Sequence, residues 1–498
     1  MKNAVYRTPL QSFYAKQSIF ITGGTGFLGK VLIEKLLRSC PDISTIYLLI
    51  RAKKDKCPET RLDEIFQVPL YNLLKKEMPD FRKKIVPIVG DLNIENFGLS
   101  EADKNILINK VSIIFHVAAN VRFNESIKVS TIINISSVDT ILKIAKCMPN
   151  LKSLIHVSTA YANCYVKYVE ERFYTYPINY KELNTLIHTL PENVFEKKIA
   201  KIISQWPNTY TFTKAIAEGL IRDESEDLPI GIFRPSIVLS SANEPFGGWI
   251  DNIYGPIGIL LCSLLGIATF LYSSKHLRAD MVPVDFTVNA LIVSAYDVFN
   301  QHRRGKDMLI YNFVSPVDGP TWSNYKNKLF VVNKIYPLHS AKWFPRGLII
   351  QNKVLYNICI FFGHFLPALF IDAATICIKR KPNLLKVYKK FHYATEAVEH
   401  FCTNEWNYST NNVKTMWDNL NEKDQQLFKF NMEKFNWSKY LTEQYMGLRR
   451  YILKEDDNTI TISRIKYKRF YWLHQMMKTV FVLIFFYIIW LIYTKIFI

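Results

Sequence analysis

The sequence lacks most features of secreted, metal-binding and nucleic-acid-binding proteins. Its eight cysteines include no CxxC pair and no dense framework, which favours reduced thiols in the cytosol over a disulfide-rich secreted domain. It has no zinc-finger spacing, Arg-rich run or low-complexity tract, and no cluster of His, Cys and acidic residues that suggests a metal. Residues 1–17 contain no apolar core, so we expect no signal peptide.

Acidic residues are in the minority. Lys and Arg number 63 against 43 Asp and Glu, which gives a formal net charge of +20. Such a balance suggests anionic partners, namely nucleic acid, phosphorylated cofactors or an acidic membrane surface. Aromatic residues make up 14% of the chain and are interleaved with the basic ones, which argues against a nucleic-acid-binding tail. We therefore predict no nucleic-acid partner.

Short apolar runs separated by amphipathic stretches dominate the first half of the chain. The runs that we predict as buried strands are 18–22, 46–50, 84–91, 111–119, 154–159 and 230–238. Segments long enough for helices, such as 27–38, lie between them. Strands that are apolar throughout and alternate with helices indicate a parallel sheet covered on both faces. We predict an α/β fold with a doubly wound parallel sheet, and the length of 498 residues suggests two or three units in all.

Three glycines at matched spacing, Gly23, Gly26 and Gly29, follow the first predicted strand in TGGTGFLG at 22–29. In a strand–turn–helix unit, Gly23 would permit the tight turn, Gly26 would let the backbone approach a pyrophosphate, and Gly29 would allow close helix packing. The N-terminus of the following helix attracts the anion. An ordinary turn is the alternative, but the flanking strand and helix favour a dinucleotide site, and GxxGxxG spacing is typical of short-chain dehydrogenases.

Basic residues follow the second predicted strand, where NAD-binding proteins place an acid for the ribose hydroxyls. Arg51 stands there, followed by Lys53 and Lys54. A guanidinium can hold a 2′-phosphate through two hydrogen bonds, so we predict NADPH in preference to NADH. A basic surface turn is the alternative. Asp91, after the third strand, is placed either to meet the adenine edge or to cap a helix.

A tyrosine and a lysine in YTFTK, Tyr210 and Lys214, are four residues apart in a helix-compatible stretch and share one face. Together with the glycine turn and VSTAY after an earlier strand, they form the Ser/Thr–Tyr–Lys set of short-chain dehydrogenases. We expect Tyr210 to give a proton to a carbonyl oxygen, and Lys214 to lower the pKa of that phenol and hold the nicotinamide ribose. Thr159, in preference to Ser158, would donate a hydrogen bond to the substrate oxygen.

Simpler interpretations exist for two histidines and for the Tyr–Lys pair of the same region. His116 and His156 lie inside apolar strands, which predicts satisfied core residues rather than ligands. An exposed Tyr and Lys on a helix face is the alternative to the catalytic set, and the co-occurrence of all three motifs argues against it.

Two apolar segments lie in the second half of the chain. Residues 347–378 are strongly apolar, are broken by Pro367 and carry Asp372. They are consistent with a buried helical pair, a membrane-surface element or a re-entrant hairpin, because Pro and Asp disfavour a straight span.

The second apolar segment, Thr479 to Thr494, is slightly shorter than the roughly 20 residues of a bilayer span. Lys478 and Lys495 can extend it by snorkelling. Four basic residues precede it, namely Arg464, Lys466, Lys468 and Arg469. By the positive-inside rule we predict a single-pass tail anchor with the body of the chain in the cytosol. A terminal helix docked on the core is the alternative.

Several longer motifs occur together in the chain. They are TGGTGFLGKVLIEKLL (22–37), IYLLIRAKK (46–54), GDL (90–92), FHVAANVRF (115–123), HVSTAY (156–161), PNTYTFTKAIAE (207–218), RPSIV (234–238), GGWIDNIYGPIGIL (247–260), RADMVPVDFTVNAL (278–291) and FNWSKYLTEQYMGLRRYILKE (435–455). Over nearly its whole length the chain thus resembles the alcohol-forming fatty acyl-CoA reductases, a family of extended short-chain dehydrogenases/reductases. The resemblance implies a cofactor site that includes the three glycines, Arg51, Asp91 and Lys214. It adds five further residues to them, namely Thr22, Phe27, Leu28, Leu92 and Ala118.

The resemblance implies NADPH-dependent reduction of a long-chain acyl-CoA to a primary alcohol through an aldehyde, with release of CoA. The basic balance suits the phosphates of CoA, and the apolar stretches at 256–272 and 347–378 suit an acyl chain drawn from a membrane. We divide the chain into a reductase domain (1–350), an apolar connecting segment (351–380), a helical domain (381–456), a basic linker (457–470) and the tail anchor (471–498). The sequence is compatible with the membrane of either the endoplasmic reticulum or the peroxisome. It is also compatible with a homo-oligomer.

Three alternatives stay open at this point. The reaction could stop at the aldehyde. A hydroxysteroid dehydrogenase or sugar-nucleotide epimerase would share the glycine turn and the Tyr–Lys pair, but would not explain GGWIDNIYGP or the distal domain. A non-enzymatic scaffold would be expected to have lost part of the Thr–Tyr–Lys set. Two positions depart from the family pattern: Asn120 stands where Thr is frequent, and Asn431 where relatives usually carry Asp.

Overall fold

The chain forms two compact units in the computed structural model, which describes residues 7–52, 56–123, 125–305 and 308–497. Unit 1 comprises Met1–Ile250, Asp280–Gly319 and Glu405–Phe435, and unit 2 comprises Asp251–Ala279, Pro320–Asn404 and Asn436–Ile498. Each unit is therefore assembled from three separate segments of the chain. The five-part division drawn from the sequence stays a prediction.

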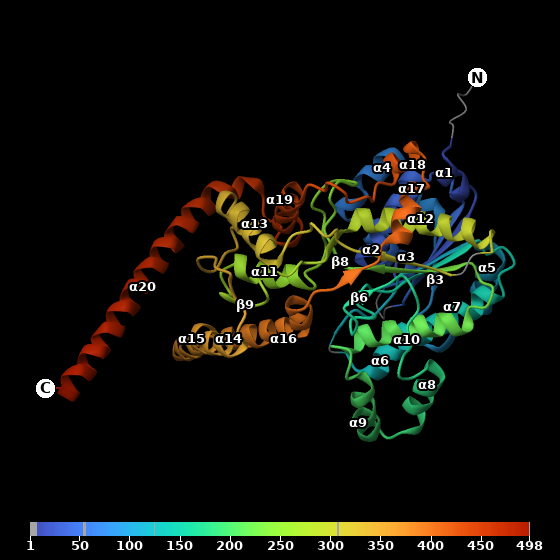
Figure 1. Cartoon of the computed structure of the whole chain (residues 1–498). Coiled ribbons are helices and arrows are strands. Elements are labelled where there is room, and N and C mark those ends of the chain that lie inside the picture. Colours follow the sequence, from blue (N-terminus) through green and yellow to red (C-terminus); the bar gives the residue numbers. More distant parts are fainter. Residues whose placement is uncertain (1–6, 53–55, 124, 306–307, 498) are drawn as a thin grey trace. The chain divides into compact units, whose positions relative to one another are not determined.

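Unit 1 is organised around a seven-stranded parallel sheet (Figure 1) in the order β11–β7–β5–β4–β1–β2–β3. The strands are β1 (Ser18–Thr22), β2 (Thr45–Ile50), β3 (Ile85–Val89), β4 (Ile113–His116), β5 (Ser153–Val157), β7 (Ile230–Pro235) and β11 (Leu309–Phe313). Every neighbouring pair is parallel. The doubly wound fold is confirmed, and all six predicted strands lie in this sheet. The seventh strand, β11, was not among the predicted strands.

Helices cover both faces of the sheet, as its wholly buried central strands require. α2 (Phe27–Ser39) and α12 (Val284–His302) pack together on one face, and α7 (Ser137–Lys146) and α10 (Thr209–Glu224) pack together on the other (Figure 1). The order of the strands reverses between β1 and β4. In such sheets ligands bind beside this switch point, at the carboxyl ends of the strands.

The remaining elements of unit 1 are short. The helices are α1 (Pro9–Tyr14), α3 (Pro58–Ile65), α4 (Asn72–Glu77), α5 (Glu101–Lys110), α6 (Ile127–Thr131), α8 (Tyr180–Thr189), α9 (Glu192–Ile203), α17 (Asn411–Asp418) and α18 (Glu422–Leu427). Two further parallel strand pairs join β8 (Ile237–Leu239) to β10 (Met281–Pro283), and β6 (Tyr168–Val169) to β13 (Asn407–Tyr408).

Unit 2 is mainly helical. α13 (Trp322–Ile335) packs against α19 (Trp437–Gly447), where the Tyr445 hydroxyl lies 2.7 Å from the side-chain oxygen of Asn333. The unit also contains α11 (Pro256–Leu264), α16 (Leu384–Thr403) and the parallel strand pair β9 (Phe270–Tyr272) and β12 (Leu348–Ile350).

The first apolar segment of unit 2 is one continuous helical run from Lys353 to Cys377. It consists of α14 (Lys353–Ile360), a π-helical turn (Phe361–Phe365) and α15 (Leu366–Cys377). The expectation that Pro367 breaks this segment is wrong, because Pro367 lies in the first turn of α15, directly after the shifted hydrogen bonds of the π turn. A buried helical pair is also excluded, since only 17% of the most apolar window is buried.

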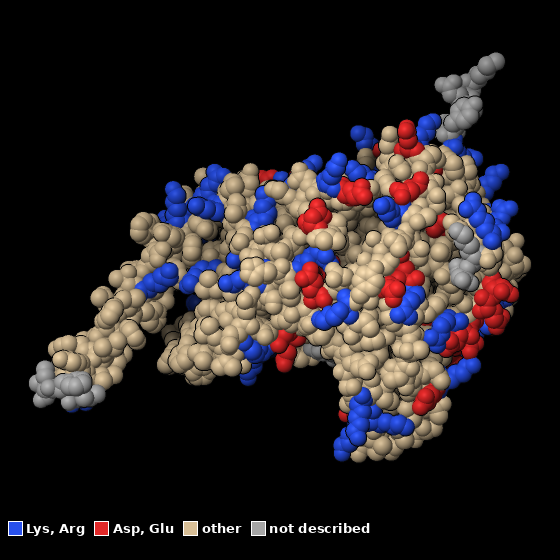
Figure 2. All heavy atoms as spheres, in the orientation of Figure 1, with Lys and Arg blue, Asp and Glu red and all other residues tan. Residues whose placement is uncertain are grey.

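The second apolar segment lies in α20 (Ile460–Phe497), a single helix that also contains the four upstream basic residues. Every large apolar side chain from Val480 to Tyr493 is exposed, and Figure 2 shows this part of α20 as uncharged surface. The run is therefore not docked on a core. Both this helix and the Lys353–Cys377 run are long and apolar enough to cross a membrane.

Candidate active site

The glycine turn at the end of β1 is shaped by two close approaches. Gly23 has a φ of 75°, and a Cβ there would lie 2.7 Å from the backbone nitrogen of Ala118. A Cβ on Gly29 would lie 2.2 Å from the Gly23 carbonyl oxygen. Side chains at both positions are therefore excluded, the first by the left-handed turn and the second by the packing of α2 on that turn.

Gly26 differs from the other two glycines because its Cβ would meet only the Gly23 carbonyl oxygen, at 3.2 Å. It is exposed and forms the N-cap of α2 without a side-chain hydrogen bond. The first backbone N–H groups of α2 thus face a cradle that a side chain would fill. This is the arrangement in which a helix N-terminus receives a pyrophosphate, so the residues present fit a dinucleotide.

The neighbouring residues of the predicted cofactor site hold this turn in place. The Thr22 hydroxyl lies 2.7 Å from Nδ1 of His116 and accepts a hydrogen bond from the Ala118 backbone at 3.2 Å. Phe27 stacks on Trp249 with ring centroids 5.3 Å apart, and Leu28 is half-buried beside it in α2.

Arg51 and Asp91 lie together after the ends of β2 and β3. Arg51 Nε is 3.8 Å from Asp91 Oδ2, and 56% of the Arg51 side chain is exposed. Asp91 Oδ1 accepts hydrogen bonds from the backbone and side chain of Asn93 at 3.0 and 2.8 Å. Asp91 therefore closes a local turn and does not cap a helix, and Leu92 is half-buried next to it. Lys53 and Lys54 lie outside the described residues.

The proposed reactive hydroxyls meet between α10 and the end of β5. Asn208 caps α10 by accepting a hydrogen bond from the Thr211 backbone at 2.9 Å, which fixes the first turn that carries Tyr210. The side chains of Tyr210 and Thr159 are hydrogen-bonded to each other. Lys214, one turn further along α10, donates to the Val157 carbonyl at 2.7 Å. The structure thus brings three of the four predicted catalytic residues together.

Burial controls the acidity of this group. It raises the pKa of Tyr210 to about 12, against the opposing effect of the hydrogen bond with Thr159. Burial also lowers the pKa of Lys214 to about 7, with Glu218 acting in the opposite direction. The expectation that Lys214 lowers the pKa of Tyr210 is therefore not met in this geometry, because the lysine is turned to the Val157 carbonyl and burial dominates.

Ser158 belongs to a different network from Thr159. Its hydroxyl donates to Glu218 Oε1 at 2.6 Å. Glu218 in turn receives two hydrogen bonds from the fully buried Arg234, at 2.9 and 2.7 Å. This network ties α10 to β7 and engages the Ser158 hydroxyl, whereas Thr159 faces Tyr210. Sequence reasoning missed the Glu218–Arg234 pair, although both residues lie inside the quoted motifs.

The two histidines of the sheet are neutral core residues, but only one is satisfied. His116 contacts the hydroxyls of Thr22 and Ser137 at 2.7 and 3.2 Å, and burial lowers its pKa to about 3. His156 is equally buried, and neither ring nitrogen has a hydrogen-bond partner among the described residues. The expectation of a satisfied core residue is therefore wrong for His156.

Two asparagines that depart from the family pattern stabilise turns. The Asn120 backbone donates to Asn134 Oδ1 at 2.8 Å, and Asn120 Oδ1 accepts from the Arg122 backbone at 3.1 Å. Asn431 Oδ1 accepts from the Glu433 backbone at 2.8 Å. A carboxylate would accept the same bond, so Asn431 replaces Asp without loss of this contact.

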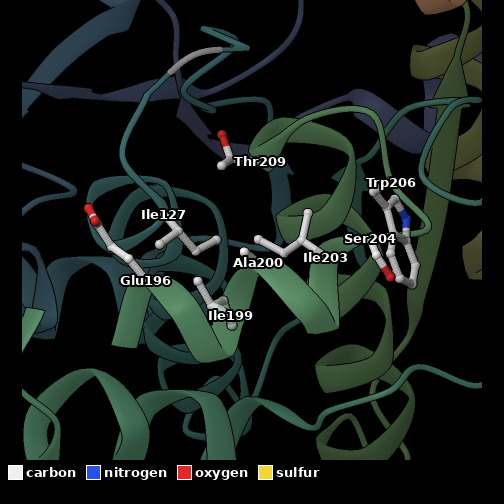
Figure 3. Close-up of a pocket in the computed structure, with 8 residues that line it drawn as sticks. All are labelled: Ile127, Glu196, Ile199, Ala200, Ile203, Ser204, Trp206 and Thr209. Carbon is white, nitrogen blue, oxygen red and sulfur yellow. The ribbon is translucent and has the colours of Figure 1, made fainter. Parts of the chain in front are cut away.

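A mostly apolar surface cavity of about 360 Å³, open to solvent, lies between α6 and α9, next to the start of α10 (Figure 3). Its lining residues are Ile127, Glu196, Ile199, Ala200, Ile203, Ser204, Trp206 and Thr209. Thr209 immediately precedes Tyr210, whose ring also contacts Phe123 at 5.9 Å. Neither apolar stretch predicted to hold an acyl chain, 256–272 or 347–378, contributes a residue. The apolar spacing along residues 194–203 was the sequence signal that could have indicated this cavity.

The fold and the glycine turn define an extended short-chain dehydrogenase/reductase with a site for a nicotinamide dinucleotide. Two family models described as male sterility protein match residues 21–291, the NAD-binding part, and 363–455. The chain belongs to the fatty acyl-CoA reductase family. It is 37% identical over 475 residues to fatty acyl-CoA reductase wat of Drosophila melanogaster, covering 95% of this chain and 91% of that protein.

A second relative and two solved structures are also similar to this chain, the structures in fold alone. The chain is 35% identical to mouse fatty acyl-CoA reductase 1, over 91% of this chain and 88% of that protein. Its fold is similar to the terminal R domain of the myxalamid pathway, with a TM-score of 0.56, 17% identity and coverage of 87% and 90%. A reductase domain of a nonribosomal peptide synthetase from Mycobacterium tuberculosis gives a TM-score of 0.56 at 18% identity, with coverage of 87% and 91%.

Proposed function

We propose that this chain reduces long-chain fatty acyl-CoA to a primary alcohol with two NADPH. The first hydride would give a hemithioacetal that collapses to an aldehyde and the free thiol of CoA, and the second hydride would reduce the aldehyde. Membership of the fatty acyl-CoA reductase family supports the substrate and the reaction. The observation that carries the assignment to residues is the hydrogen-bonded pair Thr159–Tyr210, with Lys214 one helical turn away. The hydride would come from NADPH held by the glycine turn at its pyrophosphate and by Arg51 at its 2′-phosphate.

The residues of the chain supply the proton and the charge stabilisation. Hydride addition places negative charge on the carbonyl oxygen. Thr159 would donate a hydrogen bond to that oxygen, and Tyr210 would give it a proton from the phenol. Protonated Lys214 would hold the nicotinamide ribose through its ammonium group. The same three groups serve reduction of the thioester and of the aldehyde, because both steps place charge on one oxygen.

The cavity between α6 and α9 would hold the acyl chain. Its volume of about 360 Å³ lies in the range of roughly 300–1,000 Å³ that is usual for small-molecule sites. Figure 3 shows Ile127, Ala200 and Ile203 around its centre, with the Glu196 carboxylate turned outward. The lining is therefore apolar where the chain would lie, and it opens beside the residue that precedes Tyr210.

The membrane is the proposed location of the enzyme. α20 would anchor the chain in the endoplasmic reticulum or the peroxisome, with the reductase in the cytosol, because every side chain from Val480 to Tyr493 is a large apolar one and is exposed.

The decisive experiment is product analysis after Tyr210→Phe. Membranes containing the full chain are supplied with palmitoyl- or stearoyl-CoA and NADPH, and lipids are identified by gas chromatography. We expect fatty alcohol from the unaltered chain and none from Tyr210→Phe, which still binds NADPH. Tyr168→Phe, at an exposed tyrosine, is the matched control and should keep full activity. Near-normal turnover in Tyr210→Phe would disprove the assignment, and aldehyde as the sole product would remove the second reduction.

A further inference from the structure

The helical run α14–α15 has its apolar side turned away from the protein. Ten large apolar side chains on it are between 50% and 67% exposed. They are Val354, Leu355, Ile358, Phe361, Phe362, Leu369, Phe370, Ile371, Ile376 and Ile378, which we call the apolar face. Figure 2 shows the surface over α14 and α15 as uncharged. Soluble monomers rarely expose a continuous apolar surface of this extent, so the face requires a partner.

The opposite side of the same run is polar and is already engaged within unit 2. Asp372 accepts hydrogen bonds from the backbone N–H groups of Asn383, Leu384 and Leu385, at 3.1, 3.0 and 2.9 Å. It thereby caps the N-terminus of α16.

His364 fixes the middle of the run in the same orientation. Its Nε2 accepts from the Thr269 backbone at 3.0 Å, and its Nδ1 lies 3.1 Å from Nε2 of His392 on α16. Rotating the helix would break these bonds, so the orientation of the apolar face is determined by unit 2 itself. If the run crossed a bilayer, Asp372 and His364 would have to enter the hydrocarbon core together with their polar partners, which is costly.

Basic residues follow the apolar run in the sequence. Lys379, Arg380, Lys381, Lys386, Lys389 and Lys390 follow it along the turn into α16, and all six side chains are exposed. We call them the basic cluster. The sequence contains no Asp or Glu between Asp372 and Glu396, so the cluster has no acid within its own segment. An apolar helix face bordered by Lys and Arg is the composition of helices that lie in the headgroup region of an anionic membrane.

We propose that α14–α15 lies in the plane of one anionic phospholipid leaflet, as a second membrane contact that is separate from α20. The apolar face is buried at the boundary of the acyl chains, and the basic cluster binds headgroup phosphates. This contact goes beyond the proposed reaction and anchor, because it orients unit 2 on the membrane surface.

Three native cysteines make the proposal testable in the full chain. Cys377 lies on α15, whereas Cys57 and Cys147 lie in unit 1, and all three are exposed. The chain is reconstituted in phosphatidylcholine vesicles with or without phosphatidylserine and recovered by flotation. Its cysteines are then reacted with a water-soluble maleimide and quantified separately by peptide mass spectrometry.

With phosphatidylserine we expect Cys377 to react about tenfold more slowly than Cys57 and Cys147. Lys389→Glu with Lys390→Glu should restore fast reaction of Cys377. The matched control, Lys75→Glu with Lys76→Glu, reverses an adjacent pair of exposed lysines on α4 and should change nothing. Equal rates at all three cysteines in the floated chain would overturn the proposal.

A phospholipid with a photoactivatable acyl chain identifies what covers the face. Lipid adducts on residues 354–378 support the proposal, whereas cross-links there to a second copy of the chain or to another protein overturn it. Failure of the proposed tail anchor is distinguishable, because it appears as loss of flotation of the whole chain and not as fast labelling of Cys377 in floated material.

Discussion

The charge of Lys214 depends on pH in the neutral range because the side chain is buried. Its pKa is lowered to about 7 by burial, so the ammonium is present below that pH and is lost as pH rises through it. Tyr210, with a pKa of about 12, keeps its proton throughout. If protonated Lys214 is needed, kcat/KM should fall above about pH 7. The pH dependence of kcat/KM reports the pKa values of groups in the free enzyme. A profile that stays flat from about pH 6 to 9 would contradict this role.

Arg51 is the residue that we expect to separate NADPH from NADH. Its side chain is largely exposed, and among the residues that the structure describes it forms an ion pair only with Asp91, at 3.8 Å, so it is available to a 2′-phosphate. A charge-assisted hydrogen bond contributes about 1.5–3 kcal/mol, so Arg51→Ala should raise KM for NADPH about tenfold or more. KM for NADH should change little. Arg82→Ala, which removes a surface arginine paired with Asp63, is the control. Equal effects on both cofactors would discard the role.

Predictability from sequence differs between the strands and the site. Six strands were predicted because each is mainly apolar, a pattern that central parallel strands share. β11 was missed because it lies in LIYNF, where Asn312 interrupts the apolar pattern. In the folded chain the Asn312 side chain donates to the Val169 carbonyl at 3.1 Å, a contact 143 residues away in sequence.

The residues of the site were predicted by motif, whereas their electrostatics were not. Spacing alone places Tyr210 and Lys214 on one face of a helix, but the hydrogen bond from Lys214 to Val157 depends on how α10 meets β5. The same holds for Ser158, which is adjacent to Thr159 yet is bound by Glu218. Burial, which sets both pKa values, arises only when the sheet and its helices assemble.

The cavity between α6 and α9 makes a prediction about chain length. Ala200 lines it from α9, and Ala200→Trp would fill part of its 360 Å³. Each excluded methylene costs about 1–3 kcal/mol of binding, so activity should fall at least about tenfold with palmitoyl-CoA and stay near normal with octanoyl-CoA. Lys197→Trp adds the same ring to the exposed side of this helix and should have no effect. Parallel losses with both substrates would place the acyl chain elsewhere.

At the scale of the whole molecule, we expect α20 to hold the chain in a membrane. Its residues Val480 to Tyr493 expose apolar side chains on every side, a surface that suits the acyl chains of lipid. Lysine at the centre of a span costs about 2.5–3.5 kcal/mol each, so Ile484→Lys with Ile488→Lys should release the chain from membranes. Ile462→Lys with Ile465→Lys introduces the same charges into the same helix before the apolar run, at exposed positions, and should leave the chain bound. Resistance to carbonate extraction distinguishes the two variants.

A tag placed after Ile498 should also be protected from protease until the vesicles are permeabilised, whereas a tag before Met1 should be digested at once. If both tags are digested equally, α20 does not span the membrane, and the apolar run must be covered by protein.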